Sequence, residues 1–208
     1  VCDTAVVVGN AIKKRQRVLF EGAQGSMLDI DHGTYPFVTS SNATSGGVCT
    51  GAGVSPTAVD AVVGIAKAYA TRVGGGPFPS EDCGPDADLL REHGGEFGTV
   101  TGRPRRCGWF DVPLAKYVHM INGLTSIIVT KLDVLDHRKI IPVCTGYKYR
   151  GELLEEMPAL SRILQAVEPV IEEFPGWNCS TRGVKNYDEL PQAAKNYISY
   201  LEEKVEVE

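Results

Sequence analysis

The sequence predicts an α/β fold with a mostly parallel central sheet and flanking helices. Two observations support this class: short apolar runs typical of buried strands alternate with helical segments, and capping residues stand at the expected helix ends. The clearest strand begins the stretch TSIIVTKLDVLD at 125–136. The clearest helix covers VPLAKYVHMIN, because Asp111 can cap its start and Gly123 follows its end.

Three further elements are expected in the first half of the chain. The run QRVLFEG at 16–22 stops at a glycine and is typical of a buried strand. Ser55-Pro56 is a helix-start signal, so the small and apolar residues 57–72 are interpreted as a buried helix. The stretch PDADLLREHG predicts a short surface helix that Gly94 closes.

Two elements are expected in the second half. The run IIPVCTGYKY at 140–149 is a strand candidate, and its internal proline predicts a position at the edge of the sheet. The stretch LPQAAKNYISYLEEKV predicts a helix with one apolar face, formed by Leu190, Ala194, Tyr197 and Leu201.

Charge and cysteine content exclude several classes of protein. The formal net charge of −5 and an isoelectric point near 5.5 argue against bulk electrostatic binding to nucleic acid or anionic lipid. No apolar run approaches the length of a transmembrane helix, so we expect no membrane partner. The six cysteines form no CxxC pair and no zinc-type cluster, which predicts free thiols in a reducing cytoplasm.

The TKLD motif after the apolar strand is a candidate base-reading element. Ligands gather at the carboxyl ends of parallel strands, and Asp133 would lie there. One carboxylate can accept both N1–H and the 2-amino group of guanine, while the stem of Lys131 can cover the face of the base. Taken alone, this four-residue motif is a weak signal, and a solvated surface pair is the more common explanation of such a pattern.

The stretch GTVTGRPRRCGW at 98–109 gathers three arginines in an otherwise acidic chain. A guanidinium is planar and permanently charged, and it binds phosphate or carboxylate oxygens through paired hydrogen bonds. Gly102 lets a ligand approach the backbone, and two threonines offer hydroxyl groups. The motif predicts a local site for a small anion; the alternative is a solvated turn.

Residues 22–53 are rich in Gly, Ser, Thr and Asn and predict a long functional loop. Gln24 stands close to two glycines, where its amide can read a polar ring, and the TSSN cluster at 39–42 suits phosphate or ribose. These side chains could equally form Asx-turns and caps. The DIDH group at 29–32 does not have the spacing of a calcium loop.

In their order along the chain, these motifs resemble adenylosuccinate synthetases. The resemblance runs from about Val18 to about Ile198 and rests on FEGAQGSMLDIDHGTYPFVTSSNATSGGVCTGAG, KAYATRVGGGPFP, EFGTVTGRPRRCGW, TKLDVLD, FPGW and LPQAAKNYI. That family joins IMP to L-aspartate with GTP and Mg2+ on the way to AMP, and it works as a homodimer. The resemblance therefore implies a GDP-forming ligase whose fold is related to, but distinct from, that of P-loop proteins.

The resemblance also implies a role for individual residues. IMP would contact Gln24, Thr39 and Arg103, of which Gln24 and Arg103 would support catalysis. L-Aspartate would bind the loop formed by Thr99, Val100, Thr101, Gly102, Arg103, Pro104 and Arg105. GTP would contact Arg105, Lys131, Leu132 and Asp133. Two positions depart from the family pattern: Val100 stands where threonine is usual, and Pro104 where a basic residue is common.

Other parts of the family's machinery are expected outside residues 1–208. The glycine-rich phosphate loop, the catalytic aspartate, the general-acid histidine and the magnesium ligands would precede Val1, and a last guanine-contacting segment would follow Glu208. None of the four histidines matches the catalytic one. We therefore expect residues 1–208 to be a partial synthetase domain, inactive alone. The alternatives are a non-catalytic nucleotide-binding or assembly module and a phosphoryl transferase with another substrate.

Overall fold

The computed structural model describes residues 1–99, 102–154 and 156–207. Within them the helices are α1 (Thr4–Lys13), α2 (Gly46–Ala52), α3 (Pro85–Gly94), α4 (Val112–Asn122), α5 (Ser161–Leu164) and α6 (Gln192–Val205). The strands are β1 (Val63–Lys67), β2 (Ala70–Arg72), β3 (Arg106–Gly108), β4 (Phe110–Asp111), β5 (Ser126–Thr130), β6 (Ile140–Tyr149), β7 (Glu152–Leu154) and β8 (Glu168–Pro175). Short 3-10 turns are η1 (Ser26–Leu28), η2 (Pro56–Ala58), η3 (Leu132–Leu135) and η4 (Tyr187–Glu189).

The α/β class is confirmed, with strands of both orientations. Strand β1 pairs in parallel with β5, and β4 pairs in parallel with β6. Antiparallel pairing joins β6 to β7 and to β8, and β2 to β3. The parallel pair β1–β5 ends at Lys67 and Thr130, and the site described below is built where those two strands finish.

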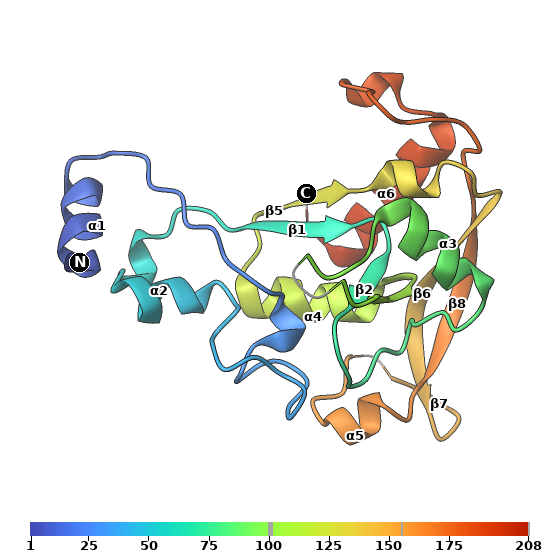
Figure 1. The fold of residues 1–208 in the computed structure, drawn as a ribbon, viewed down its shortest axis with the longest axis horizontal. Coiled ribbons are helices and arrows are strands. Elements are labelled where there is room, and N and C mark those ends of the chain that lie inside the picture. Colours follow the sequence, from blue (N-terminus) through green and yellow to red (C-terminus); the bar gives the residue numbers. More distant parts are fainter. Residues whose placement is uncertain (100–101, 155, 208) are drawn as a thin grey trace.

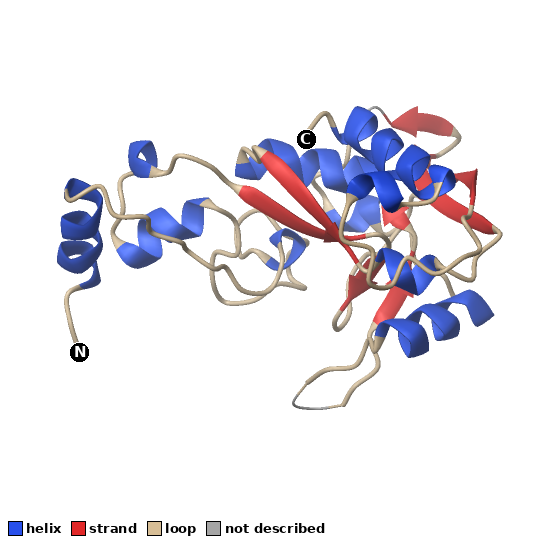
Figure 2. Cartoon of the chain, turned by 90° about the horizontal axis from the view of Figure 1, so that it is seen from above, coloured by secondary structure: helices blue, strands red, loops and turns tan. Residues whose placement is uncertain are grey.

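The molecule is elongated, with the N-terminal helices α1 and α2 at one end and the sheets at the other (Figure 1). Helix α1 has no buried residue. Seen from above, loops dominate the part of the chain between α1 and the strands (Figure 2). In the part of the chain that the structure describes, no helix is both long and apolar enough to span a bilayer.

Helices α4 and α6 follow the sequence prediction. The Asp111 carboxylate accepts the Leu114 amide at 3.1 Å and caps α4, and Gly123 ends it with a φ of +60°. Helix α6 buries Ala194, Tyr197, Leu201 and Val205 in the main core, close to the predicted face. Leu190 packs against the same core from the segment that precedes the helix.

The expected helix over residues 57–72 is wrong. Only Pro56–Ala58 form a 3-10 turn, and the following residues form β1 and β2. The apolar strand β5 offers β1 a parallel partner, and that pairing outweighs the weak helical preference of a valine-rich segment. Gly64 supports it, because a Cβ there would come within 2.8 Å of the Leu124 side chain.

Two strand predictions also need correction. Residues 16–22 form no strand: they pair with no described segment, and Leu19 is 92% exposed. A strand needs a neighbour for its backbone groups, which an apolar pattern alone does not supply. The strand at 140–149 exists, but it is not at an edge, because β8 lies on one side of β6 and β4 and β7 on the other.

Two smaller predictions agree with the structure. The helix PDADLLREHG is α3, although the glycine that closes it is Gly95, with a φ of +61°. All six cysteines are free.

Candidate functional site

The arginine-rich stretch forms a closed turn between α3 and β3. The Gly98 amide donates to the Arg103 carbonyl at 2.8 Å, and the Arg105 amide donates to the Glu96 carbonyl at 2.9 Å. These bonds fix the backbone at both ends of the turn, so the arginine side chains start from defined positions. Gly102 lies within it with a φ of +63°, a conformation that favours glycine.

The residues of the predicted aspartate loop have different environments. Thr99, Gly102, Arg103 and Pro104 are exposed. Arg105 is half-buried and points its guanidinium inward. Val100 and Thr101 lie outside the described residues. The exposed part of the turn is therefore accessible to a ligand, whereas Arg105 is anchored.

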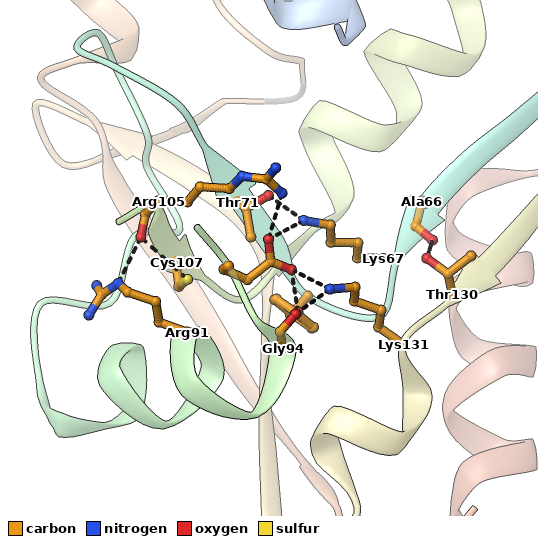
Figure 3. A network of polar contacts seen from close by, with 11 residues as sticks. Ala66, Lys67, Thr71, Arg91, Gly94, Arg105, Cys107, Thr130 and Lys131 are labelled. Carbon is orange, nitrogen blue, oxygen red and sulfur yellow. Dashed lines mark hydrogen bonds and ion pairs between the residues drawn. The ribbon is translucent and has the colours of Figure 1, made fainter. Parts of the chain in front are cut away.

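The side chain of Glu96 holds Arg105 in place. Its carboxylate is fully buried and accepts from Arg105 Nη1 at 2.8 Å, Lys131 Nζ at 3.0 Å and Lys67 Nζ at 2.7 Å. The hydroxyl of Tyr69 donates to the same carboxylate at 2.5 Å. Figure 3 shows the three cationic side chains converging from separate parts of the chain. The predicted anion-binding turn and the predicted base-reading segment are thus joined at one buried carboxylate.

The charge on Glu96 is stabilised by these donors. Burial by itself would raise the pKa of Glu96, but the hydrogen bonds from Lys67, Tyr69 and Lys131 outweigh it and lower the pKa to about 2. Burial lowers the pKa of Lys67. Three cations face one carboxylate, so the cluster keeps an excess of positive charge that suits a second anion.

The end of β5 opens onto a pocket of about 370 Å³. Lys131, Leu132 and Asp133 line one side of it, and residues 181–187 with Leu190 line the other. The Asp133 side chain is 38% exposed, and Arg182 Nε lies 3.8 Å from its Oδ2. Because Arg182 is 86% exposed, that ion pair is weak and leaves the carboxylate available to a ligand.

Asp136 holds the far wall of the pocket in place. Its buried carboxylate accepts from Trp177 Nε1 at 2.8 Å and from the amide and hydroxyl of Thr181, both at 2.8 Å. Asp136 is three residues after Asp133, so one short turn supplies both a pocket carboxylate and the support of the opposite wall.

Asp29 organises the polar loop that contains two of the three predicted IMP contacts. It is fully buried and accepts four backbone amides, those of Asp31, His32, Ala43 and Thr44, at 2.6–3.0 Å. Burial alone would raise its pKa, and these four bonds hold it well below the usual 3.8. Asp29 therefore folds the loop and is not an open metal ligand.

Two of the three predicted IMP contacts, Gln24 and Thr39, lie on this loop. Gln24 is exposed and has a φ of +63°, and half-buried Thr39 donates its amide to the Leu28 carbonyl at 2.7 Å. The loop reaches the arginine turn through β2, since Arg72 donates to Thr34 Oγ1 at 2.8 Å and is paired in register with Arg106. Gln24 and Thr39 themselves are not at the Glu96 cluster.

Replacing Asp29 with asparagine is expected to reduce the free energy of unfolding of the full-length protein by about 3 kcal/mol, because two partly buried amides lose their acceptor. Urea denaturation followed by circular dichroism measures this loss. The stabilisation by Asp29 is present above about pH 4 and is lost as the pH falls below the usual pKa of 3.8. The difference in free energy of unfolding between wild type and Asp29→Asn should therefore become smaller in acid.

Asp31→Asn is the matched control. Asp31 is exposed and accepts only from the side chain of Asn42 at 2.7 Å among the hydrogen bonds described, so its loss should cost less than about 0.5 kcal/mol. Equal effects of the two substitutions would contradict the structural role of Asp29.

Comparison with known proteins identifies the family. The sequence model described as adenylosuccinate synthetase matches residues 1–208. The chain belongs to the adenylosuccinate synthetase family. It is 57% identical to the adenylosuccinate synthetase of Solibacter usitatus and 54% identical to that of Brachyspira hyodysenteriae, over 208 residues in both cases. These matches cover 100% of this chain and 48% and 49% of the two relatives.

The fold agrees with a solved member of the family. The structure of fully ligated adenylosuccinate synthetase from Plasmodium falciparum matches with a TM-score of 0.96 and 44% sequence identity. The match covers 100% of this chain and 50% of that one. The chain thus has an adenylosuccinate synthetase fold and spans about half the length of the relatives it matches.

Sequence reasoning missed several residues of this candidate site. Glu96 stands two residues before the arginine stretch, and an isolated acidic residue next to clustered cations was the available signal. Lys67 was hidden by the incorrect helix over 57–72. The pocket wall at 181–187 carries no apolar periodicity, so only the tertiary fold places it opposite Asp133.

Proposed function

We propose that the full-length protein containing this chain is an adenylosuccinate synthetase that joins L-aspartate to IMP with GTP, as a cytosolic homodimer. The 6-oxygen of IMP would attack the γ-phosphorus of GTP, and the aspartate amine would then displace the phosphate. Residues 1–208 would supply parts of the IMP, aspartate and guanine sites.

The observation that carries this proposal is the convergence of Arg105 and Lys131 on Glu96, in a chain that matches the family over its whole length. It places the arginine turn beside the end of β5, where a nucleotide and a dicarboxylate could lie together. Arg103 is exposed on that turn, where it can hold the carboxylates of aspartate, and Asp133 lines a pocket that could take guanine. Fixed positive charge next to phosphoryl oxygens lowers the barrier to phosphoryl transfer.

Magnesium does not fit the residues described. No three acidic, histidine or cysteine side chains converge on a metal site within 1–99, 102–154 and 156–207. The one fully buried carboxylate of the polar loop, Asp29, is saturated by backbone amides. We therefore propose that the ligands of any magnesium ion come from the rest of the full-length chain.

The test is a product assay on the full-length protein with IMP, GTP and L-aspartate, read by liquid chromatography and mass spectrometry. We expect adenylosuccinate and GDP in equal amounts, and no product when any substrate is omitted. Residues 1–208 expressed alone should form none. A folded full-length protein that forms no adenylosuccinate would overturn the proposal. Product from residues 1–208 alone would contradict the part of the proposal in which these residues supply only parts of the substrate sites.

A further inference from the structure

The contacts of Glu96 are divided between its two oxygens. Oε2 accepts from Lys67 and Arg105, at 2.7 and 2.8 Å. Oε1 accepts from Tyr69 at 2.5 Å and from Lys131 at 3.0 Å. A carboxylate is rigid and planar, so a shift of one oxygen moves the other. The arginine turn and the end of β5 therefore cannot move independently while Glu96 is in place.

Glu96 is the ion-pair partner of both cations in the described structure. The Nε of Arg105 is buried and makes no hydrogen bond there, so the bond from Nη1 to Glu96 orients its guanidinium. Lys131 has a φ of +60°, and its Nζ otherwise donates to the carbonyl of Gly94. Gly94 itself packs closely against the Tyr69 ring, since a Cβ there would lie 2.2 Å from the hydroxyl.

The negative charge of Glu96 also allows the three cationic side chains to lie close together. Without Glu96, three positive charges would be within reach of one another in a partly buried space and would repel. A neutral side chain of the same shape would keep the packing but lose the attraction. Arg105 and Lys131 would then turn towards solvent, away from any ligand placed between them.

We propose that Glu96 is a positioning residue that sets Arg105 and Lys131 in one fixed relation and so couples the aspartate-binding turn to the guanine-nucleotide pocket. This inference rests on the proposed function and deepens it. Glu96 touches no substrate; it acts through Arg105 on one side and through Lys131 on the other.

The test is Glu96→Gln in the full-length protein, which keeps the size of the side chain and an acceptor for Tyr69. We expect KM to rise about tenfold or more for both GTP and L-aspartate, while KM for IMP changes less than about threefold. A role in stability alone would lower the active fraction, and hence kcat, and would leave every KM unchanged.

Glu81→Gln is the matched control. Glu81 holds Arg106, the residue after Arg105, with a contact of 2.7 Å between Oε1 and Nε, and it is partly buried. Glu81 has no contact with Lys131 in the described structure. Glu81→Gln should lower the melting temperature and leave KM for GTP and L-aspartate within about twofold of wild type.

Two further measurements keep the outcome decisive. If Glu96→Gln does not fold, Tyr69→Phe removes one donor to Oε1 and should raise KM for both GTP and L-aspartate by about threefold. Titration calorimetry with GDP reads the same coupling without turnover, so Glu96→Gln should weaken GDP binding even if the product assay fails. A full-length wild type that binds GDP but forms no adenylosuccinate would overturn the proposed function alone.

The inference is overturned if folded Glu96→Gln leaves both KM values and GDP affinity at wild-type levels. It is also overturned if only one of the two KM values rises, because coupling through a shared carboxylate requires both. Equal effects of Glu81→Gln and Glu96→Gln on KM would likewise contradict it.

Discussion

Replacing Asp133 with asparagine in the full-length protein is expected to lower kcat/KM for GTP by about 1000-fold. In the proposed arrangement Asp133 accepts the N1–H and the 2-amino group of guanine. Asparagine has no charge, and its amide nitrogen would meet one of these donors with another donor. Both effects weaken the binding of GTP in the ground state and in the transition state.

The same substitution should favour xanthosine triphosphate, whose base has a carbonyl where guanine has the 2-amino group. The asparagine amide can donate to that carbonyl, so we expect xanthosine triphosphate to restore activity to within about tenfold of the wild-type value with GTP. Steady-state kinetics with both nucleotides checks this exchange. If Asp133→Asn keeps the preference for GTP, Asp133 does not read the base.

Asp188→Asn is the control for this experiment. Asp188 is exposed on η4, beside the pocket residue Tyr187, and does not line the pocket. Its substitution should leave kcat/KM for GTP within about twofold of wild type. A loss of activity in this variant would point to general disturbance of the pocket wall.

Arg103→Lys is expected to raise KM for L-aspartate by about 100-fold and to change KM for GTP much less. Arg103 is exposed on the turn whose ends are fixed by backbone hydrogen bonds. A guanidinium can hold a carboxylate through two parallel bonds, whereas an ammonium keeps the charge but loses the fork. Initial rates at varied L-aspartate concentration, with GTP and IMP saturating, measure the effect.

Arg106→Lys is the control that tests whether the rise in KM for L-aspartate is specific to Arg103. The guanidinium of Arg106 is occupied by Glu81 and by the carbonyls of Gly74 and Gly76. We expect this variant to be less stable and to keep a normal KM for L-aspartate. Unchanged aspartate kinetics in Arg103→Lys would remove Arg103 from the aspartate site.

Local signals in the sequence were reliable where one residue decides the local structure. Asp111 and Gly123 mark the ends of α4 because a carboxylate satisfies the first free amides of a helix and a glycine tolerates a positive φ. The apolar face of α6 predicts its buried side because the helical repeat brings those residues to one surface.

Predictions failed where the choice of partner decides the structure. Residues 57–72 have the small side chains of a buried helix, yet β5 offers β1 a parallel strand and the segment extends. The proline at 142 suggested an edge strand, but β6 has neighbours on both sides. Pairing partners lie tens of residues apart, and no local pattern names them.

The sequence alone determined the family of this protein, the position of its motifs and the ends of helices α4 and α6, because each depends on residue identity or on neighbours along the chain. Only the tertiary structure decided that Arg105, Lys131 and Lys67 share the Glu96 carboxylate, and that residues 181–187 face Asp133. A buried carboxylate must find its counter-charges in space, and the cations that stabilise Glu96 come from three separate segments of the chain.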